Sequence, residues 1–253
     1  MGKIRVYDMR VISEEEYKDF VRSEVQEWRE YAKLTIEKVE TIASSQAQLL
    51  CYFSLIECLA QDVANYPDRG QQKIFTDFVL KYQNKYDYLN EVDPVTLFYH
   101  AEKNYSGLLS IKDFQEGEIC HPTDAFIREK ASNFIATLTA TIGEENANKF
   151  VLKHRYVDLL YRMRCRLSHE FSLSHIGHIR HQEEPYYISC YRSYLKDGKI
   201  IEDDVWMLSI PVSFVKNICI NCVDNYLDEC VKNNVLPVDN NSMDRFCELS
   251  WYR

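Results

Sequence analysis

Three arginines and one histidine lie within eight residues of this chain, at Arg162, Arg164, Arg166 and His169. Arginine is a strong anion binder, and histidine is the side chain whose charge changes near neutral pH. Residues of these types at this spacing can bind an anion and exchange a proton with it. The stretch YRMRCRLSHEF, residues 161–171, is therefore the first candidate site in the sequence.

This region is positively charged, although the chain as a whole is acidic. Residues 149–181 hold seven Lys or Arg against two acidic residues, together with five of the seven histidines. The chain as a whole carries a net charge of −9, so the remaining residues carry a net charge near −14. A local excess of positive charge attracts anions, whereas the overall acidity argues against general coating of nucleic acid. A solvated helix face paired with neighbouring acids is the alternative interpretation.

Apolar periodicity predicts one long helix from about Glu144 to His169 under this site. Its core stripe consists of Leu152, Tyr156, Leu159, Leu160, Met163 and Leu167. At 100° per residue, the stripe opposite the core carries Arg155, Arg162, Arg166 and His169. Arg164 falls on the other flank of the core stripe. A histidine near a helix C-terminus also stabilises the helix dipole, which is a purely structural reading of His169.

The elements that position this helix are mostly helices as well. Apolar steps of three and four predict earlier helices over residues 14–44, 44–66, 71–89, 94–104 and 124–142, with an irregular segment at 105–122. Ser13 and Glu16 form a capping box before the first helix. Asp197-Gly198 is a hairpin turn signal between two β-branched and aromatic runs, about 186–195 and 200–210. A last helix is predicted over 212–233.

The predicted fold is mainly α, a helical bundle with a small antiparallel β-hairpin near the C-terminus, in a single domain of residues 1–253. Residues 41–235 form the expected core, 1–40 an appended helix that gates the site or contacts a partner, and 236–253 a tail. No apolar run reaches 18 residues, so we expect no membrane span. Nine cysteines without a secretion signal predict reduced, mostly buried thiols in a cytoplasmic protein.

The stretch RCRLSH resembles the Arg-x4-6-His signature of HEPN domains, the higher-eukaryote and prokaryote nucleotide-binding superfamily. The matching positions, in the order of the family pattern, are Tyr161, Arg164, Cys165, Leu167 and His169. The upstream segment YFSLIECLAQ, with Glu57 among apolar residues, resembles the early core helix of the family. The hairpin and final helix resemble those of larger bacterial members. The likeness covers roughly residues 40–235.

HEPN domains are helical bundles that typically dimerise, so that two Arg-His motifs share a cleft. Many are metal-independent endoribonucleases of toxin–antitoxin, phage-defence or RNA-processing systems. The resemblance implies that His169 is the acid or base and Arg164 the phosphate clamp, with 2′-hydroxyl attack leaving a 2′,3′-cyclic phosphate. It implies RNA contacts from Arg162, Arg166 and Arg155. It further implies no cofactor, and as partners RNA, a second copy of the chain and an antitoxin or sensor protein.

Several alternatives stay open at this point. Arg162 also fits the signature, with six intervening residues, and shares a helix face with His169. Glu57 is either a buried carboxylate with a raised pKa, a cap, or a partner of an arginine on the motif helix, and we prefer the pairing. Some HEPN toxins carry a modified tyrosine where this chain has Phe171, so control by adenylylation is not expected. The function classes are a ribonuclease, a catalytically silent HEPN module, and an unrelated helical interaction protein.

Other groupings of reactive residues are weaker. His175, His178 and His181 have a spacing that suits a metal, but Gly177 lies among them and no acidic or Cys ligand has a fixed place. We expect no metal there and favour a flexible segment at the rim of the cleft. Cys219 and Cys222 form one C-x2-C pair, where a zinc ribbon needs two, and they also fit an apolar helix stripe. We expect them to be buried thiols.

Overall fold

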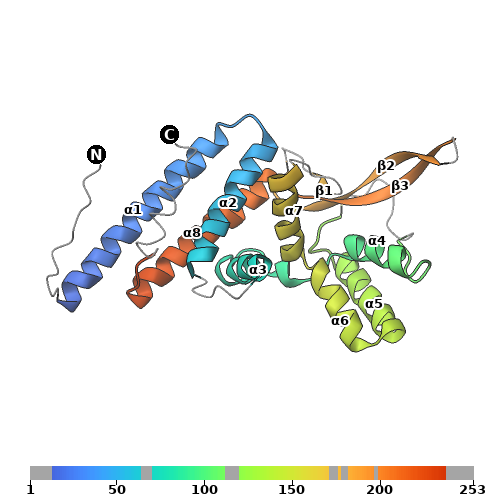
Figure 1. The fold of residues 1–253 in the computed structure, drawn as a ribbon, viewed down its shortest axis with the longest axis horizontal. Coiled ribbons are helices and arrows are strands. Elements are labelled where there is room, and N and C mark those ends of the chain that lie inside the picture. The colour runs from blue at the N-terminus through green and yellow to red at the C-terminus, as the bar shows by residue number, and fades with distance from the viewer. Residues whose placement is uncertain are drawn as a thin grey trace.

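A computed structural model describes residues 13–63, 70–111, 120–170, 176–177, 182–196 and 199–237 of the chain. The helices are α1 (Glu14–Glu40), α2 (Ser45–Val63), α3 (Gln71–Tyr82), α4 (Pro94–Asn104), α5 (Ala125–Ile142), α6 (Glu144–Val151), α7 (Tyr156–Glu170) and α8 (Val212–Asn233). Two 3-10 helices are η1 (Asp87–Asn90) and η2 (Leu152–His154), and the strands are β1 (Ile176–Gly177), β2 (Tyr186–Lys196) and β3 (Lys199–Ser209). The predicted mainly α fold with an antiparallel hairpin is confirmed (Figure 1).

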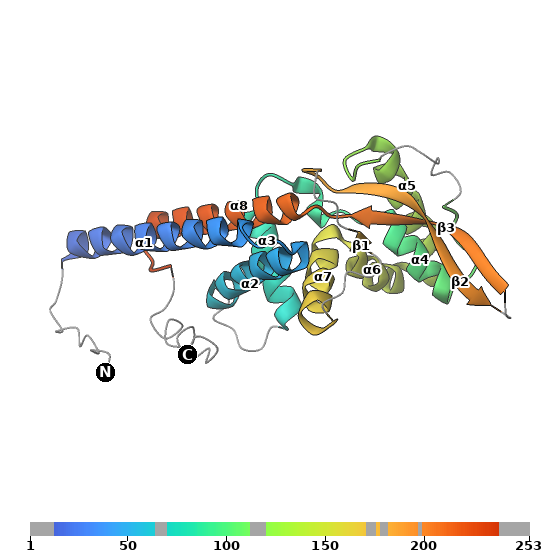
Figure 2. The same cartoon turned by 90° about the horizontal axis from the view of Figure 1, so that it is seen from above.

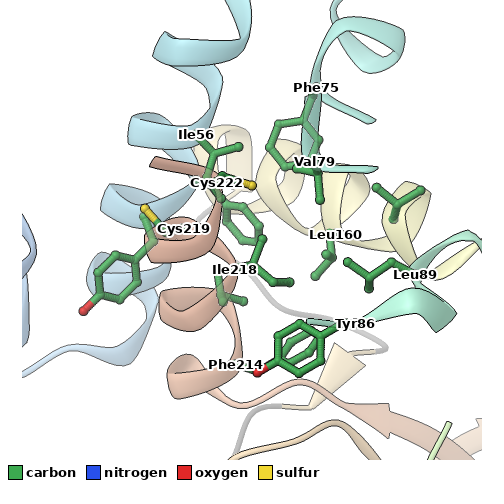
Figure 3. Close-up of a cluster of buried hydrophobic side chains, with 14 of the residues drawn as sticks. Ile56, Phe75, Val79, Tyr86, Leu89, Leu160, Phe214, Ile218, Cys219 and Cys222 are labelled. Atoms are coloured by element: carbon green, nitrogen blue, oxygen red, sulfur yellow. The ribbon is translucent and has the colours of Figure 1, made fainter. Parts of the chain in front are cut away.

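Helices α1, α2, α3, α7 and α8 pack together and form what we call the main bundle (Figures 1 and 2). The long helices α1 and α8 lie side by side, and α2 packs on both. Figure 3 shows the centre of the apolar core, where α2, α3, α7 and α8 contribute Ile56, Val79, Leu160 and Ile218. The capping box predicted at Ser13 and Glu16 is present at the start of α1. The sequence is apolar almost all round α2, and this helix is indeed central.

Helices α4, α5 and α6 form a second group with its own apolar cluster, which we call the small bundle. Its buried residues include Leu97, Ala101, Phe134, Leu138 and Ala147. Asp93 caps α4 by accepting hydrogen bonds from the backbone N–H groups of Val95 and Thr96, and Pro94 opens the helix. Pro at the first helical position costs no hydrogen bond, because that N–H has no partner inside the helix.

The sheet has the order β1-β3-β2. Strands β2 and β3 pair antiparallel from Tyr186↔Ser209 to Lys196↔Lys199, as the hairpin prediction required. The predicted turn residues Asp197 and Gly198 lie outside the described residues. The sequence did not indicate β1, which pairs parallel with β3 through Ile176↔Leu208 and Gly177↔Ser209. Two residues are too few to carry a readable strand pattern. The base of the hairpin packs on the helices, where Tyr187 and Leu208 are buried.

The predicted bounds are right for α4 and α8, whereas the first and third predicted helices are too long. The first helix ends at Glu40 instead of Ser44. The third ends at Tyr82, because Gln83 forms a buried turn in which its side chain bonds the backbone carbonyl and N–H of Tyr86 at 2.7 and 2.8 Å. These two bonds replace helical ones, and the 3-10 helix η1 follows. A glutamine side chain acting as a local backbone substitute leaves no periodic signal.

The single helix predicted over 144–169 is wrong, because the structure divides it into α6, η2 and α7. Arg155 is extended there, with φ −67° and ψ 148°. The backbone of the break pairs with residues 91–93: Asp93 N–H donates to the His154 carbonyl at 2.9 Å, and Tyr156 N–H donates to the Glu91 carbonyl at 3.0 Å. Leu152, predicted to be core, is 54% exposed. Hydrogen bonds to a distant segment therefore override a local helical pattern.

Candidate functional site

Helix α7 carries the candidate site and lies between α2 and α3 on one side and the sheet on the other (Figures 1 and 2). Its first turn is fixed by Asp158, which accepts hydrogen bonds from Arg155 Nε and Gln72 Nε2, each at 2.7 Å. Its apolar face is buried in the main bundle through Val157, Leu159, Leu160, Met163 and Leu167. These contacts determine which side chains of the helix can reach solvent.

Arg164 packs against α2 and pairs with Glu57. Its Nε donates to Glu57 Oε2 at 2.8 Å, and its second terminal nitrogen donates to the same oxygen. The two side chains are 20% and 12% exposed, so the ion pair is largely shielded from water. The predicted pairing of Glu57 with an arginine of the motif helix is confirmed. Burial lowers the pKa of Arg164, but the hydrogen bonds and charge of Glu57 outweigh it and raise the pKa overall.

Arg162, Arg166 and His169 lie on the part of α7 that is not packed in the core. Arg162 and His169 are exposed, and Arg166 is half-buried. A terminal nitrogen of Arg162 donates to the Lys153 carbonyl at 2.5 Å, which steers its side chain toward η2. Although Arg162 is exposed as a residue, the protein around its guanidinium partly desolvates it, and this effect, together with the charge of Arg166, lowers its pKa. His169 stands on the last turn of the helix. The structure therefore keeps these three together on one surface and sends Arg164 to another.

The helical wheel predicted Arg155 on this surface, but the structure places it elsewhere. It precedes α7 in the extended residue described above, outside the helix. Its Nε is bonded to Asp158, and a terminal nitrogen donates to Asn90 Oδ1 at 3.0 Å. Its side chain is 22% exposed. Arg155 thus connects α7 to η1, and its predicted role in RNA contact has no geometric support from the α7 face.

The remaining candidates divide between the core and the residues that the structure does not describe. Cys219 and Cys222 are fully buried in α8, which confirms their interpretation as core thiols, and burial raises the pKa of Cys219 to about 12. Phe171, His175, His178 and His181 lie outside the described residues. Among the residues that are described, no three His, Cys, Asp or Glu side chains are grouped as metal ligands would be.

A pair of histidines that sequence reasoning missed lies beside Arg162. His100 Nδ1 and His154 Nε2 are 2.7 Å apart, and His154 Nδ1 lies 3.2 Å from Thr96 Oγ1. His154 is buried and His100 half-buried. The two histidines are far apart in the sequence, and they meet only because the chain breaks its helix at Arg155. No local pattern could have indicated this contact.

Comparison of the chain with protein-family models, with curated proteins and with solved structures finds no match. None of the described helices has the length and apolar character that crossing a membrane requires. Inference about function therefore depends on the residues of α7 and on what surrounds them.

Proposed function

We propose that this chain is a metal-independent endoribonuclease of the HEPN type, with His169 as its acid or base. The observation that carries the proposal is the exposed position of His169 on the last turn of α7, in line with Arg162 and Arg166. The opposite faces of the same helix are held by the core and by the Glu57–Arg164 ion pair. A rigid helix thus presents a titratable group and two cations to one surface.

The chemistry requires no group beyond the RNA and these side chains. The ribose 2′-oxygen forms a bond to the adjacent phosphorus, and the bond from phosphorus to the 5′-oxygen of the next nucleotide breaks. Histidine can accept the proton of the 2′-hydroxyl or donate one to the leaving oxygen. Guanidinium groups hold the non-bridging oxygens, where charge accumulates. Because the described part of α7 supplies one such histidine per copy, we propose a homodimer in which two copies provide the acid and the base.

The two candidate motif arginines have different surroundings, and we assign them different roles. Arg162 is exposed on the side of His169, so it and Arg166 are the proposed phosphate contacts. Arg164 is paired with Glu57, so we propose that it positions α7 and that the ion pair limits its contact with the phosphate. The proposed setting is the cytoplasm, which suits the free thiols at the seven cysteines whose side chains the structure describes. An antitoxin or sensor protein remains a proposed partner.

The test is RNA cleavage in EDTA, with end-labelled single-stranded RNA and structured tRNA as substrates. Wild type should cleave and leave 2′,3′-cyclic phosphate ends, and His169→Ala should lose at least about a hundredfold in rate, as loss of a general acid or base does. His121→Gln is the matched control. His121 is half-buried, its Nδ1 lies 3.0 Å from the Pro185 carbonyl oxygen, and neither residue belongs to α7. Arg162→Gln should slow cleavage more than Arg164→Gln does.

Two results would overturn the proposal. Equal cleavage by wild type and His169→Ala would show that another residue, or a contaminant, is responsible. Binding of RNA without cleavage would favour a catalytically silent module that uses the same basic surface. In that case the affinity should fall with salt, because each phosphate contact releases counterions.

A further inference from the structure

The His100–His154 pair has a geometry that leaves one ring nitrogen available to a ligand. His154 is 1% exposed, and its two nitrogens are engaged with Thr96 Oγ1 and with His100 Nδ1. The ring of Phe150 stacks on His100 with centroids 4.4 Å apart and an interplanar angle of 20°. His100 is therefore held at Nδ1 by His154 and on one ring face by Phe150. Among the described residues, none forms a hydrogen bond with its Nε2.

One of the two hydrogen-bonding arrangements of this pair makes His100 Nε2 a donor toward an anion. If His154 donates to His100 Nδ1, neutral His100 carries its hydrogen on Nε2. If His100 donates instead, its neutral ring has a lone pair on Nε2, which repels an anion, so an anion selects the first arrangement. An anion at Nε2 therefore meets an N–H group when His154 is the donor to His100 Nδ1. Burial holds the pKa of His154 down at about 3, so this buried partner stays neutral.

Positive charges from three elements converge on the same place. Lys103 follows His100 by three residues on α4, Lys153 belongs to η2, and Arg162 reaches across from α7 to the Lys153 carbonyl. After burial, these three cations are the groups that lower the pKa of His100. The surroundings thus resist a further positive charge on the imidazole, and an anion would relieve the repulsion among them. Lys153 is exposed and His100 half-buried, so the group is accessible from solvent.

We infer that His100, Lys153 and Arg162 form a phosphate-binding site that takes a second backbone phosphate of the RNA bound at His169. Arg162 belongs to both places, because it lies on the exposed face of α7 with His169 and bonds to η2 beside His100. Seven residues of helix separate Arg162 from His169, about 10 Å along the axis. A stacked strand covers that length in about three nucleotides, at about 3.4 Å each. That the phosphate belongs to RNA bound at His169 rests on the proposed function, whereas the phosphate-binding site itself does not.

The experiment uses single-stranded RNA with 2′-O-methyl groups, which can bind but lacks the hydroxyl needed for cleavage. Fluorescence anisotropy gives Kd for oligonucleotides of increasing length, with wild type, His100→Gln and the control His121→Gln. Wild-type affinity should rise once the strand is long enough to reach His100, and His100→Gln should lose roughly tenfold of that affinity while short strands bind as before. Lys153→Gln should reduce the salt dependence of log Kd by about 0.7. Unfolding curves establish that each variant is folded.

Each result separates this inference from the ribonuclease proposal. If wild type binds the 2′-O-methyl strand through His100 but cleaves no natural RNA, the site stands and the ribonuclease proposal falls. If wild type cleaves RNA while His100→Gln binds and cleaves equally well, the site falls and the ribonuclease proposal stands. Inorganic phosphate is titrated as a separate probe by NMR of the His100 ring. A phosphate-dependent shift there, with no effect of His100→Gln on RNA affinity, would overturn the assignment to RNA.

Discussion

Glu57 is an acidic side chain placed inside the main bundle, where its carboxylate meets the Arg164 guanidinium. Replacing it by glutamine removes the charge and keeps the size, which leaves a shielded arginine without its counter-charge. We expect Glu57→Gln to lower the free energy of unfolding by about 1–3 kcal/mol, because a buried charged partner is lost. Urea denaturation measures this loss directly.

The matched control for Glu57→Gln is Glu145→Gln. Glu145 also pairs with a basic residue, Lys149, but its side chain is 83% exposed. Exposed pairs contribute about 0–1 kcal/mol, so this variant should unfold nearly as wild type does. Equal stability losses in the two variants would show that the Glu57–Arg164 pair has no special contribution. RNA cleavage by Glu57→Gln at full rate would show in addition that the pair does not position α7.

The sequence indicated some of these side chains and was silent on others for a physical reason. Glu57 was noticeable because a lone acid within an apolar helix must find a partner. Arg162, Arg166 and His169 were placed together by helical spacing alone. By contrast, Arg155 was misplaced and His100–His154 missed, because both depend on backbone hydrogen bonds between residues 91–93 and 154–156. Such contacts between distant segments leave no periodic trace in one sequence.

The predicted secondary-structure elements agree with the structure where the sequence signals are local. The bounds of α8 were predicted from Pro211 and an unbroken apolar stripe, and the hairpin from a turn signal between two strand-like runs. The end of α3 and the break before α7 were not predicted, because Gln83 and the 91–93 segment supply the hydrogen bonds that would otherwise continue the helix. The single-domain organisation stays a prediction.

The break between α6 and α7 has a testable consequence for two leucines that the sequence placed on one stripe. Leu152 is 54% exposed in η2, whereas Leu160 is 2% exposed in the core of α7. Leu160→Ala should cost about 2–5 kcal/mol of unfolding free energy, because it opens a cavity. Leu152→Ala should cost less than about 1 kcal/mol, because little apolar surface is lost. Similar losses for both, measured by urea denaturation, would support the continuous helix instead.

The two bundles are joined by a buried chain of hydrogen bonds that passes through Asp93. The Tyr187 hydroxyl donates to Asp93 Oδ1 at 2.6 Å, and the Tyr156 and Tyr187 hydroxyl oxygens are 2.5 Å apart. Asp93 caps α4 of the small bundle, Tyr187 belongs to β2, and Tyr156 begins α7 of the main bundle. One carboxylate thus connects the helix of the candidate site to the helix that carries His100.

Burial makes this connection sensitive to pH. Asp93 is fully buried, and burial raises the pKa of its carboxyl, although hydrogen bonds from Tyr187 and Thr96 oppose the shift. Between the pKa of an unfolded aspartate, about 4, and the raised value, the folded chain binds more protons than the unfolded chain. The contribution of Asp93 to stability is therefore complete below the unfolded pKa and is lost as pH rises through the folded one.

Asp93→Asn removes this ionisation and should change how stability depends on pH. The unfolding free energy of the variant minus that of wild type should increase with pH across the window, by at most about 1.4 kcal/mol per pH unit, and then level off. Asp19→Asn is the control, since the Asp19 side chain is 68% exposed, and its difference from wild type should not rise in that way. A difference for Asp93→Asn that stays constant with pH would mean that the hydrogen bonds balance burial, and one that falls with pH would mean that they outweigh it. The same carboxylate would then hold the two bundles together most strongly when charged, and acid rather than base would loosen the contact between α4 and α7.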